Sequence, residues 1–231
     1  GLPGGRIRVI YNGIDHERFG SAQESRTGLR HEKKVTGRDI VFLFAARLVE
    51  QKRCTDFLKA FGKLHVETLK FQDDPDESRQ PPRARAWILG DGPLMSALQS
   101  QASRLPDPTT VTFWGKKDDV ERYMAAADVL VLPSTREGFS NAVIEAMAAG
   151  LPIIASDVGG NAEAVEDGKE GIIIPPLHVE GLTYAMRRML MEHQTRSSMS
   201  AAARVKAQRF SLDTMLHETE QLYIDCMNRH V

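Results

Sequence analysis

The sequence of 231 residues has little cysteine, no excess of charge of either sign and no long apolar run. Its two cysteines, Cys54 and Cys226, are far apart and lack metal-ligand spacing, which favours reduced thiols in a cytosolic protein. The formal net charge of −1 provides no overall basic field that would attract nucleic acid. No apolar run approaches the roughly 18 residues of a membrane-spanning helix, and the first residues do not form a signal peptide. We therefore expect a cytoplasmic protein without a nucleic-acid partner.

Several motifs of catalytic and nucleotide-binding sites are also missing. No GxGxxG follows a strand pattern and no P-loop is present, so neither a dinucleotide fingerprint nor a Walker motif is predicted. No GxSxG provides a serine nucleophile, and the seven histidines are scattered without zinc-ligand spacing. We expect no metal site, and the missing GxGxxG weighs against a Rossmann oxidoreductase.

What the sequence has is a regular alternation of short apolar runs with segments rich in Ala, Leu, Met and charged residues. The apolar runs are nearly continuous, which is typical of parallel strands covered by helices on both faces. The predicted strands are residues 7–11, 40–46, 85–89, 110–114, 128–133, 152–156 and 171–175. The predicted helices are residues 55–67, 93–105, 119–127, 141–149, 161–167, 179–193, 196–209 and 212–228. This order predicts an α/β, Rossmann-like doubly wound parallel sheet, whose ligands bind beyond the carboxyl ends of the strands.

The domain organisation follows from the same pattern. Residues 7–210 are interpreted as the α/β domain and residues 211–231 as a C-terminal helix. A polar, proline-containing stretch at about residues 70–86 predicts an exposed insertion. Residues 1–6 are interpreted as the remnant of an interdomain linker, because a domain rarely starts with an exposed linker that leads directly into a strand. The chain is therefore expected to be part of a longer protein.

The most informative loop is PSTREGFSNAVIEAMAAGLP, residues 133–152. Ser140 or Asn141 is suited to cap the start of a helix, and Gly150 is suited to end it. The first turn of this helix has unpaired N–H groups and a partial positive charge, and it lies just beyond a strand's carboxyl end. The loop therefore predicts an anion site, most simply for a phosphate.

Two glutamates accompany this helix. Glu145 is flanked by Ile144 and Ala146, where a buried carboxylate needs hydrogen-bond donors, and a ribose would supply them. The alternative places Glu145 on the polar stripe of an amphipathic helix. Glu137, in the loop, is either a site residue or a solvated turn residue. Spacing alone leaves these alternatives open.

Other candidate residues lie in the loops that follow the neighbouring strands. Arg47 and Lys52 follow the strand at 40–46 and are suited to converge on a diphosphate, unless they are ordinary surface charges. Gly90 lies in a glycine turn, LGDGPL, and Lys116 in the stretch WGKKDDV, where a plain polar turn is the alternative to a site that borders a base. The glycine-rich turn DVGGNAE at 157–163 is suited to the close approach of a ligand.

Together these motifs resemble the C-terminal domain of glycosyltransferase family 4, which has the GT-B fold. The similar stretches are VIYNGIDHERF, ARLVEQK, ILGDGPL and PSTREGFSNAVIEAMAAGLPIIASDVGG, followed by the pattern E.V.DG..GI, in that order, over about residues 9–176. The resemblance implies a retaining, metal-independent glycosyltransferase without a cofactor, whose donor is a nucleotide-diphosphate sugar of the UDP or GDP type. It implies that Glu137 faces the donor sugar at the reacting centre and that Glu145 accepts hydrogen bonds from the ribose. Arg47 and Lys52 would act on the diphosphate. The remaining donor-binding positions would be Gly90, Lys116, Gly138, Phe139, Ser140, Asn141, Ala142 and Val143.

The resemblance also implies what this chain lacks. The acceptor would be held by an N-terminal GT-B domain of the same protein, which would also carry any peripheral association with the cytoplasmic face of a membrane. This chain alone is then expected to bind the donor weakly and to be inactive. Two alternatives remain: another GT-B activity, such as a nucleotide-sugar epimerase or a phosphorylase, and a non-catalytic nucleotide-sugar-binding module. The intact set of donor-side residues argues against the second.

Overall fold

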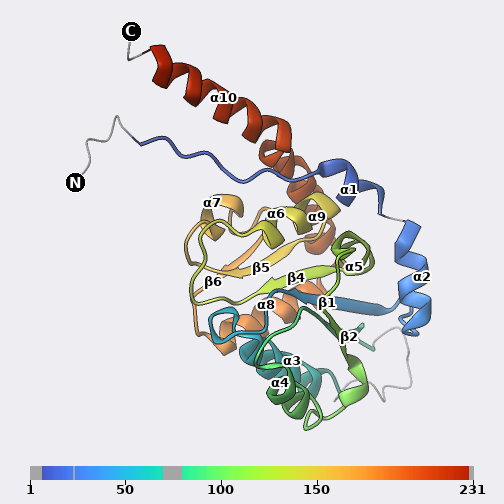
Figure 1. The fold of residues 1–231 in the computed structure, drawn as a ribbon. Coiled ribbons are helices and arrows are strands. Elements are labelled where there is room, and N and C mark those ends of the chain that lie inside the picture. Colours follow the sequence, from blue (N-terminus) through green and yellow to red (C-terminus); the bar gives the residue numbers. More distant parts are fainter. Residues whose placement is uncertain (1–6, 23, 70–79, 229–231) are drawn as a thin grey trace.

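A computed structural model of the chain describes residues 7–22, 24–69 and 80–228, which form one parallel sheet with helices on both faces (Figure 1). The strands are β1 (Asp39–Ala45), β2 (Arg83–Leu89), β3 (Val111–Gly115), β4 (Val129–Leu132), β5 (Ile153–Ser156) and β6 (Gly171–Ile174). They are ordered β3-β2-β1-β4-β5-β6, and every neighbouring pair is parallel. This is the strand order of a Rossmann sheet. The predicted doubly wound α/β fold is confirmed.

The two faces of the sheet pack into separate apolar cores because successive side chains of a strand point to opposite faces. In β1, Val41 and Leu43 belong to one core, and Phe42 and Phe44 belong to the other. The first core is covered by α1 (His16–Ser21), α2 (Glu24–Glu32), α5 (Val120–Ala126) and α6 (Asn141–Ala149). The second is covered by α3 (Cys54–Leu69), α4 (Met95–Ala102) and α8 (Val179–Met191). The helix α9 (His193–Ala207) contributes side chains to both cores.

The remaining described elements are α7 (Asn161–Ala164), α10 (Leu212–Asn228) and 3-10 turns at Glu50–Lys52, Pro108–Thr110 and Gln208–Phe210. The order of winding reverses between β1 and β4, so the crevice beyond their carboxyl ends is where this fold binds ligands. The loops that begin at residues 46 and 133 meet there. No helix in the described ranges combines the length and the apolar character that a bilayer crossing requires.

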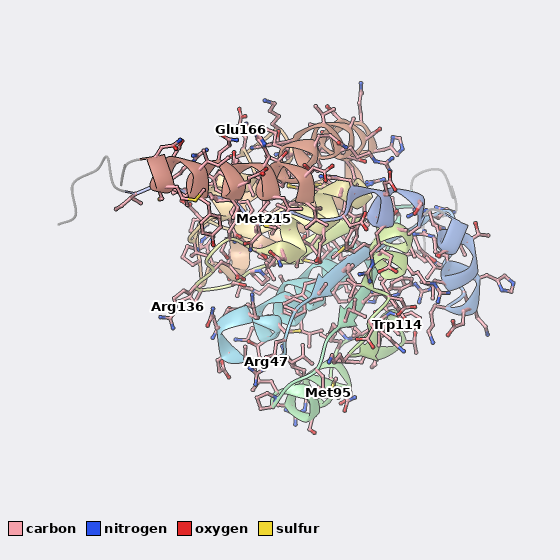
Figure 2. All side chains as sticks on the ribbon, turned by 45° about the horizontal axis from the view of Figure 1, so that its top comes forward. Arg47, Met95, Trp114, Arg136, Glu166 and Met215 are labelled. Atoms are coloured by element: carbon pink, nitrogen blue, oxygen red, sulfur yellow. The ribbon has the colours of Figure 1, made fainter. Side chains whose placement is uncertain are left out.

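The chain's first described residues and α10 project together from the body of the domain (Figure 1). Met215 of α10, labelled in Figure 2, accepts a hydrogen bond from the Gly13 amide (3.2 Å). The Ile14 amide donates to the carbonyl of Phe210 (2.9 Å), and Arg8 pairs with Asp225 (3.4 Å). No described residue of α10 is buried, so the helix exposes large apolar side chains, including Leu216, Tyr223 and Met227.

Several boundaries differ from the predictions. Residues 7–11 form no strand: Ile7 and Val9 are 61% and 65% exposed, and within the described chain no sheet edge receives them. Residues 83–86 of the predicted insertion belong to β2, where Ala84 and Ala86 are buried. The helices α1 and α2 were not predicted, although the Asp15 side chain caps α1 by accepting from the Arg18 amide (3.0 Å). Predictions for residues 1–6, 70–79 and 229–231 lie outside the described residues.

Candidate functional site

A pocket of about 190 Å³ opens at the carboxyl edge of the sheet. Its lining includes Ala46 after β1, Gly90 after β2, Lys116 after β3, and Ala142 and Glu145 of α6. Four of the predicted donor-binding positions therefore share one cavity, although they come from three separate segments of the chain. The cavity lies beside the point where the winding of the sheet reverses, as expected for a ligand site in this fold.

Gly90 shapes one wall of the pocket through its backbone. Its φ of +139° lies in a region that side chains rarely adopt, and a Cβ there would overlap the carbonyl oxygen of Ala46. Gly92 lies against the Leu48 carbonyl in the same way. The glycine turn therefore brings the loops after β1 and β2 close together, and Gly90 adds no side chain to the wall of the pocket.

Glu145 reaches this pocket from the second turn of α6. It is half-buried, and burial raises the pKa of its carboxyl group above the ordinary value, an effect that the nearby charge of Arg18 opposes. Within the described part of the chain, the Glu145 carboxylate has no hydrogen-bond or ion-pair partner. Placement on a solvated polar stripe is thus the weaker of the two interpretations, because the carboxylate faces a pocket and lacks the donors that its burial calls for.

Arg18 is a residue that the sequence analysis missed. Its guanidinium donates to Glu121 (2.7 Å and 3.0 Å) and to the carbonyl of Asp118 (2.7 Å). It thereby ties α1 to the loop that carries Lys116, on the side where Glu145 lies. Arg18 lies in the stretch VIYNGIDHERF, but the sequence does not reveal its contacts, which depend on α1 packing against α5.

Glu137 and Lys52 form an ion pair, with the Lys52 Nζ 2.7 Å and 2.8 Å from the two carboxylate oxygens. The Glu137 side chain is only 7% exposed and that of Lys52 is 22% exposed. The interpretation of Glu137 as a solvated turn residue is therefore wrong. Lys52 is not an isolated surface charge either, because its ammonium group is committed to this carboxylate.

Backbone contacts lock the loops around this pair. The Thr135 amide donates to the carbonyl of Gln51 (2.9 Å), and the Gln51 side chain donates to the carbonyl of Arg136 (2.7 Å). Gly159, with a φ of +53°, packs against the Glu137 carbonyl, where a Cβ would overlap the oxygen. The turn at 157–163 thus allows the close approach of the Glu137 loop, and its expected role in the approach of a ligand stays a prediction.

The start of α6 lies where the sequence predicts it. Ser140 is the N-cap residue, but its side chain makes no capping hydrogen bond. The amide groups of the first turn therefore keep their partial positive charge without a side-chain acceptor from this residue. Asn141 accepts instead from the Asn12 side chain (2.8 Å), and the Phe139 ring packs against Tyr11 at 4.8 Å. These contacts join the start of α6 to the segment before α1.

Arg47 is exposed near the beginning of the loop after β1 (Figure 2). Its side chain makes no ion pair or hydrogen bond with any residue in the described ranges. The exposed Arg136 projects from the loop after β4 (Figure 2) and was also missed by the sequence analysis. In the described part of the chain, no three His, Cys, Asp or Glu side chains gather where they would hold a metal ion.

Known proteins share this sequence and fold. An exopolysaccharide phosphotransferase of Streptomyces coelicolor is 31% identical over 87% of this chain and 20% of its own length. N-acetyl-alpha-D-glucosaminyl L-malate synthase of Bacillus anthracis is 25% identical over 97% of this chain and 55% of its own length. The crystal structure of HepE from Anabaena in complex with UDP superposes with a TM-score of 0.84, at 24% identity, over 96% of this chain and 58% of that one.

The chain thus spans little more than half of some of its curated relatives and a fifth of another. The structural likeness supports the Rossmann-like fold, and the family follows from the sequence. The family model described as "Glycosyl transferases group 1" matches residues 39–192, which is more than half of the chain and includes Arg47, Glu137 and Glu145. The chain belongs to the group 1 glycosyl transferase family.

Proposed function

We propose that this chain is the donor-binding half of a retaining, metal-independent glycosyltransferase of family 4, with the C-terminal position in a GT-B fold. The observation that carries the proposal is Glu145: a half-buried carboxylate that has no hydrogen-bond or ion-pair partner among the described residues, in a pocket at the switch point of a Rossmann sheet. A nucleoside supplies what this carboxylate lacks, because the two ribose hydroxyls are donors.

The nucleotide base occupies the part of the pocket beside Gly90 and Lys116, and the ribose lies against Glu145. The diphosphate then extends toward the first turn of α6, whose amide groups at Ala142 and Val143 favour an anion. Arg47, which is free of other partners among the described residues, supplies a guanidinium for a phosphate oxygen.

Lys52 and Glu137 act together at the junction between the diphosphate and the sugar. An ammonium group has three donors, and the pair with Glu137 uses two. The third donates to the leaving phosphate, whose negative charge grows as the glycosidic bond breaks. Glu137, held beside this cation, faces the anomeric carbon either as a nucleophile or as electrostatic support of the cationic transition state.

The acceptor belongs to a domain outside this chain. The chain covers about half of the length of several relatives, and α10 exposes apolar side chains that a second domain would cover. HepE was crystallised with UDP and with UDP-glucose, which makes a uridine donor the first to test. We propose that the isolated chain binds the donor without transferring its sugar, and that the whole protein is cytoplasmic.

Thermal unfolding with UDP, GDP and ADP tests the donor site. A nucleotide at about 100 times its dissociation constant should stabilise the chain by about 2.7 kcal/mol. We expect one base to give this shift and Arg47→Gln to reduce it, whereas Arg83→Gln, on an exposed residue at the start of β2, should leave it unchanged. If none of the three nucleotides shifts the transition, the chain has no donor site of its own.

A further inference from the structure

A second pocket, of about 280 Å³, lies on the side of the sheet where the strands begin, opposite the proposed donor site. It is bounded by the turn between α5 and β4, the turn between α6 and β5, and residues of α9 from His193 to Arg204. Asp128 and Pro152, which immediately precede β4 and β5, mark it as a feature of the amino ends of the strands. It is therefore separate from the proposed donor site at their carboxyl ends.

The lining of this second pocket is cationic. Arg26, Arg196 and Arg204 line it together with His193, and Asp128 is its one acidic lining residue among those the structure describes. That single carboxylate is already shared, because Arg26 contacts one oxygen at 2.6 Å and Arg30 contacts the other at 2.9 Å.

The other two guanidinium groups have only carbonyl acceptors in the described chain. Arg196 donates to the carbonyls of Met189 and Leu190 at the end of α8, and Arg204 donates to the Ala149 carbonyl (3.4 Å). Burial lowers the pKa of Arg196, although the charge of Asp128 opposes this effect. Arg196 is half-buried and Arg204 is exposed, and an added anion stabilises both guanidinium groups because neither has a carboxylate of its own.

The backbone is adapted to the position of Arg204. Gly150 ends α6 with a φ of +82°, and a Cβ on this residue would overlap the Arg204 guanidinium. The Ser200 hydroxyl donates to the Gly150 carbonyl (2.6 Å) and so satisfies an acceptor that would otherwise repel an anion. The end of α6 and the face of α9 thus hold the guanidinium against the wall of the cavity.

We propose that this second pocket binds a phosphate group, held by Arg196 and Arg204, as free phosphate or as the monoester of a small metabolite. A guanidinium matches the tetrahedral oxygens of phosphate through paired N–H donors. The volume is near the lower end of the range for small-molecule sites, so it accommodates a phosphate with a small organic group. The site is joined to the donor pocket by α6, whose first turns reach the donor pocket and whose last residue reaches this one.

Amide chemical shifts of the nitrogen-15-labelled chain test the proposal. Inorganic phosphate, added at constant ionic strength against chloride, should shift the amides of Gly150, Ser197 and Ser200 in a saturable manner. The same titration with glycerol phosphate separates the two sources: tighter binding of the ester identifies a phosphorylated metabolite, and equal binding identifies phosphate itself. UDP serves as the reference for the donor site. It should shift the amide signals of Ala142 and Gly138 before those of the second pocket.

Variants decide whether the guanidinium groups hold the anion. Arg204→Gln should weaken phosphate binding by about tenfold or more, as expected for the loss of a charge-assisted contact. Arg204→Lys should weaken it less. Arg187→Gln, on an exposed arginine of α8 that pairs with Glu67, should leave it unchanged. Arg204 is the better position for this test, because replacement of Arg196 would also remove its hydrogen bonds to the end of α8. The proposal is overturned if chloride reproduces the shifts, or if Arg204→Gln binds phosphate like the unchanged chain.

Discussion

Replacement of Glu145 by glutamine should affect stability and ligand binding in opposite directions. Burial raises the pKa of the Glu145 carboxyl group, so folding disfavours its ionised form. The stability linked to this group is complete below the ordinary pKa of a glutamate and is lost as the pH rises through the raised, folded-state pKa. At neutral pH the empty chain therefore carries a cost that Glu145→Gln removes. We expect the variant to unfold at a higher temperature than the unchanged chain when no nucleotide is present.

The same substitution should weaken nucleotide binding. A hydrogen bond to a charged acceptor contributes about 1.5–3 kcal/mol, and the amide retains one neutral acceptor in place of two ionised oxygens. The loss should be about 1–2 kcal/mol, or roughly 5- to 30-fold in the dissociation constant for UDP. Isothermal titration calorimetry measures it. The affinity of the unchanged chain should also fall as the pH is lowered through the raised pKa, whereas that of the variant should not.

The matched control is Glu166→Gln, on a glutamate whose side chain is 63% exposed and which lies outside the pocket. Its removal should alter neither the UDP affinity nor the way that affinity depends on pH. The reasoning fails if Glu145→Gln binds UDP as tightly as the unchanged chain, because the carboxylate then receives no ribose hydroxyl. It also fails if the empty variant is less stable, because Glu145 would then have a partner within the fold.

Three further predictions concern the surrounding structure. Lys52→Ala leaves a nearly buried carboxylate unpaired and should lower the free energy of unfolding by roughly 1–3 kcal/mol in urea denaturation, less than a fully buried pair because the lysine is partly exposed; an unchanged midpoint would contradict it. Gly159→Ala should destabilise by more than about 1 kcal/mol, since its φ is positive and a Cβ meets the Glu137 loop, whereas Gly28→Ala in an open part of α2 should stabilise by about 0.5–1 kcal/mol. Because α10 exposes Leu216 and Tyr223 and this chain has no second domain to cover them, we expect the isolated chain to self-associate through that face. Replacing both residues by glutamine should reduce this association in sedimentation velocity without changing UDP affinity, and equal association in the variant would exclude that face.

The sequence predicts the central strands of the sheet well because β1, β4 and β5 are mainly apolar runs that are buried on both faces. The run Val129–Leu132 is completely buried, and its pattern leaves little choice of structure. Residues 7–11 have a similar apolar, β-branched pattern and form no strand. Strand formation also requires a neighbouring edge, and the composition of a segment carries no information about which edges remain open.

The candidate site was predicted as a set of residues but not as a set of contacts. The ordered motifs indicate which loops meet, since loops at the carboxyl ends of parallel strands share one edge of the sheet. They do not indicate that Lys52 pairs with Glu137, because this contact joins residues 85 positions apart. Nor do they indicate Arg18, whose position depends on how α1 packs.

The Lys52–Glu137 pair gives the proposed mechanism a physical constraint. The Glu137 carboxylate is only 7% exposed and needs a cation beside it. A donor diphosphate near Lys52 would compete with Glu137 for the N–H groups of the ammonium. If Lys52 turned fully to the phosphate, Glu137 would be left buried and unpaired next to a dianion. Retention of the lysine between the two avoids this, because one ammonium group then stabilises both charges.

Lys52→Arg should therefore disturb the sugar end of the site more than the nucleotide end: a planar guanidinium keeps the charge but directs its donors differently. Calorimetry with UDP and with UDP-glucose would show this as a larger loss of affinity for the sugar nucleotide, and an equal loss for both would place Lys52 at the diphosphate alone.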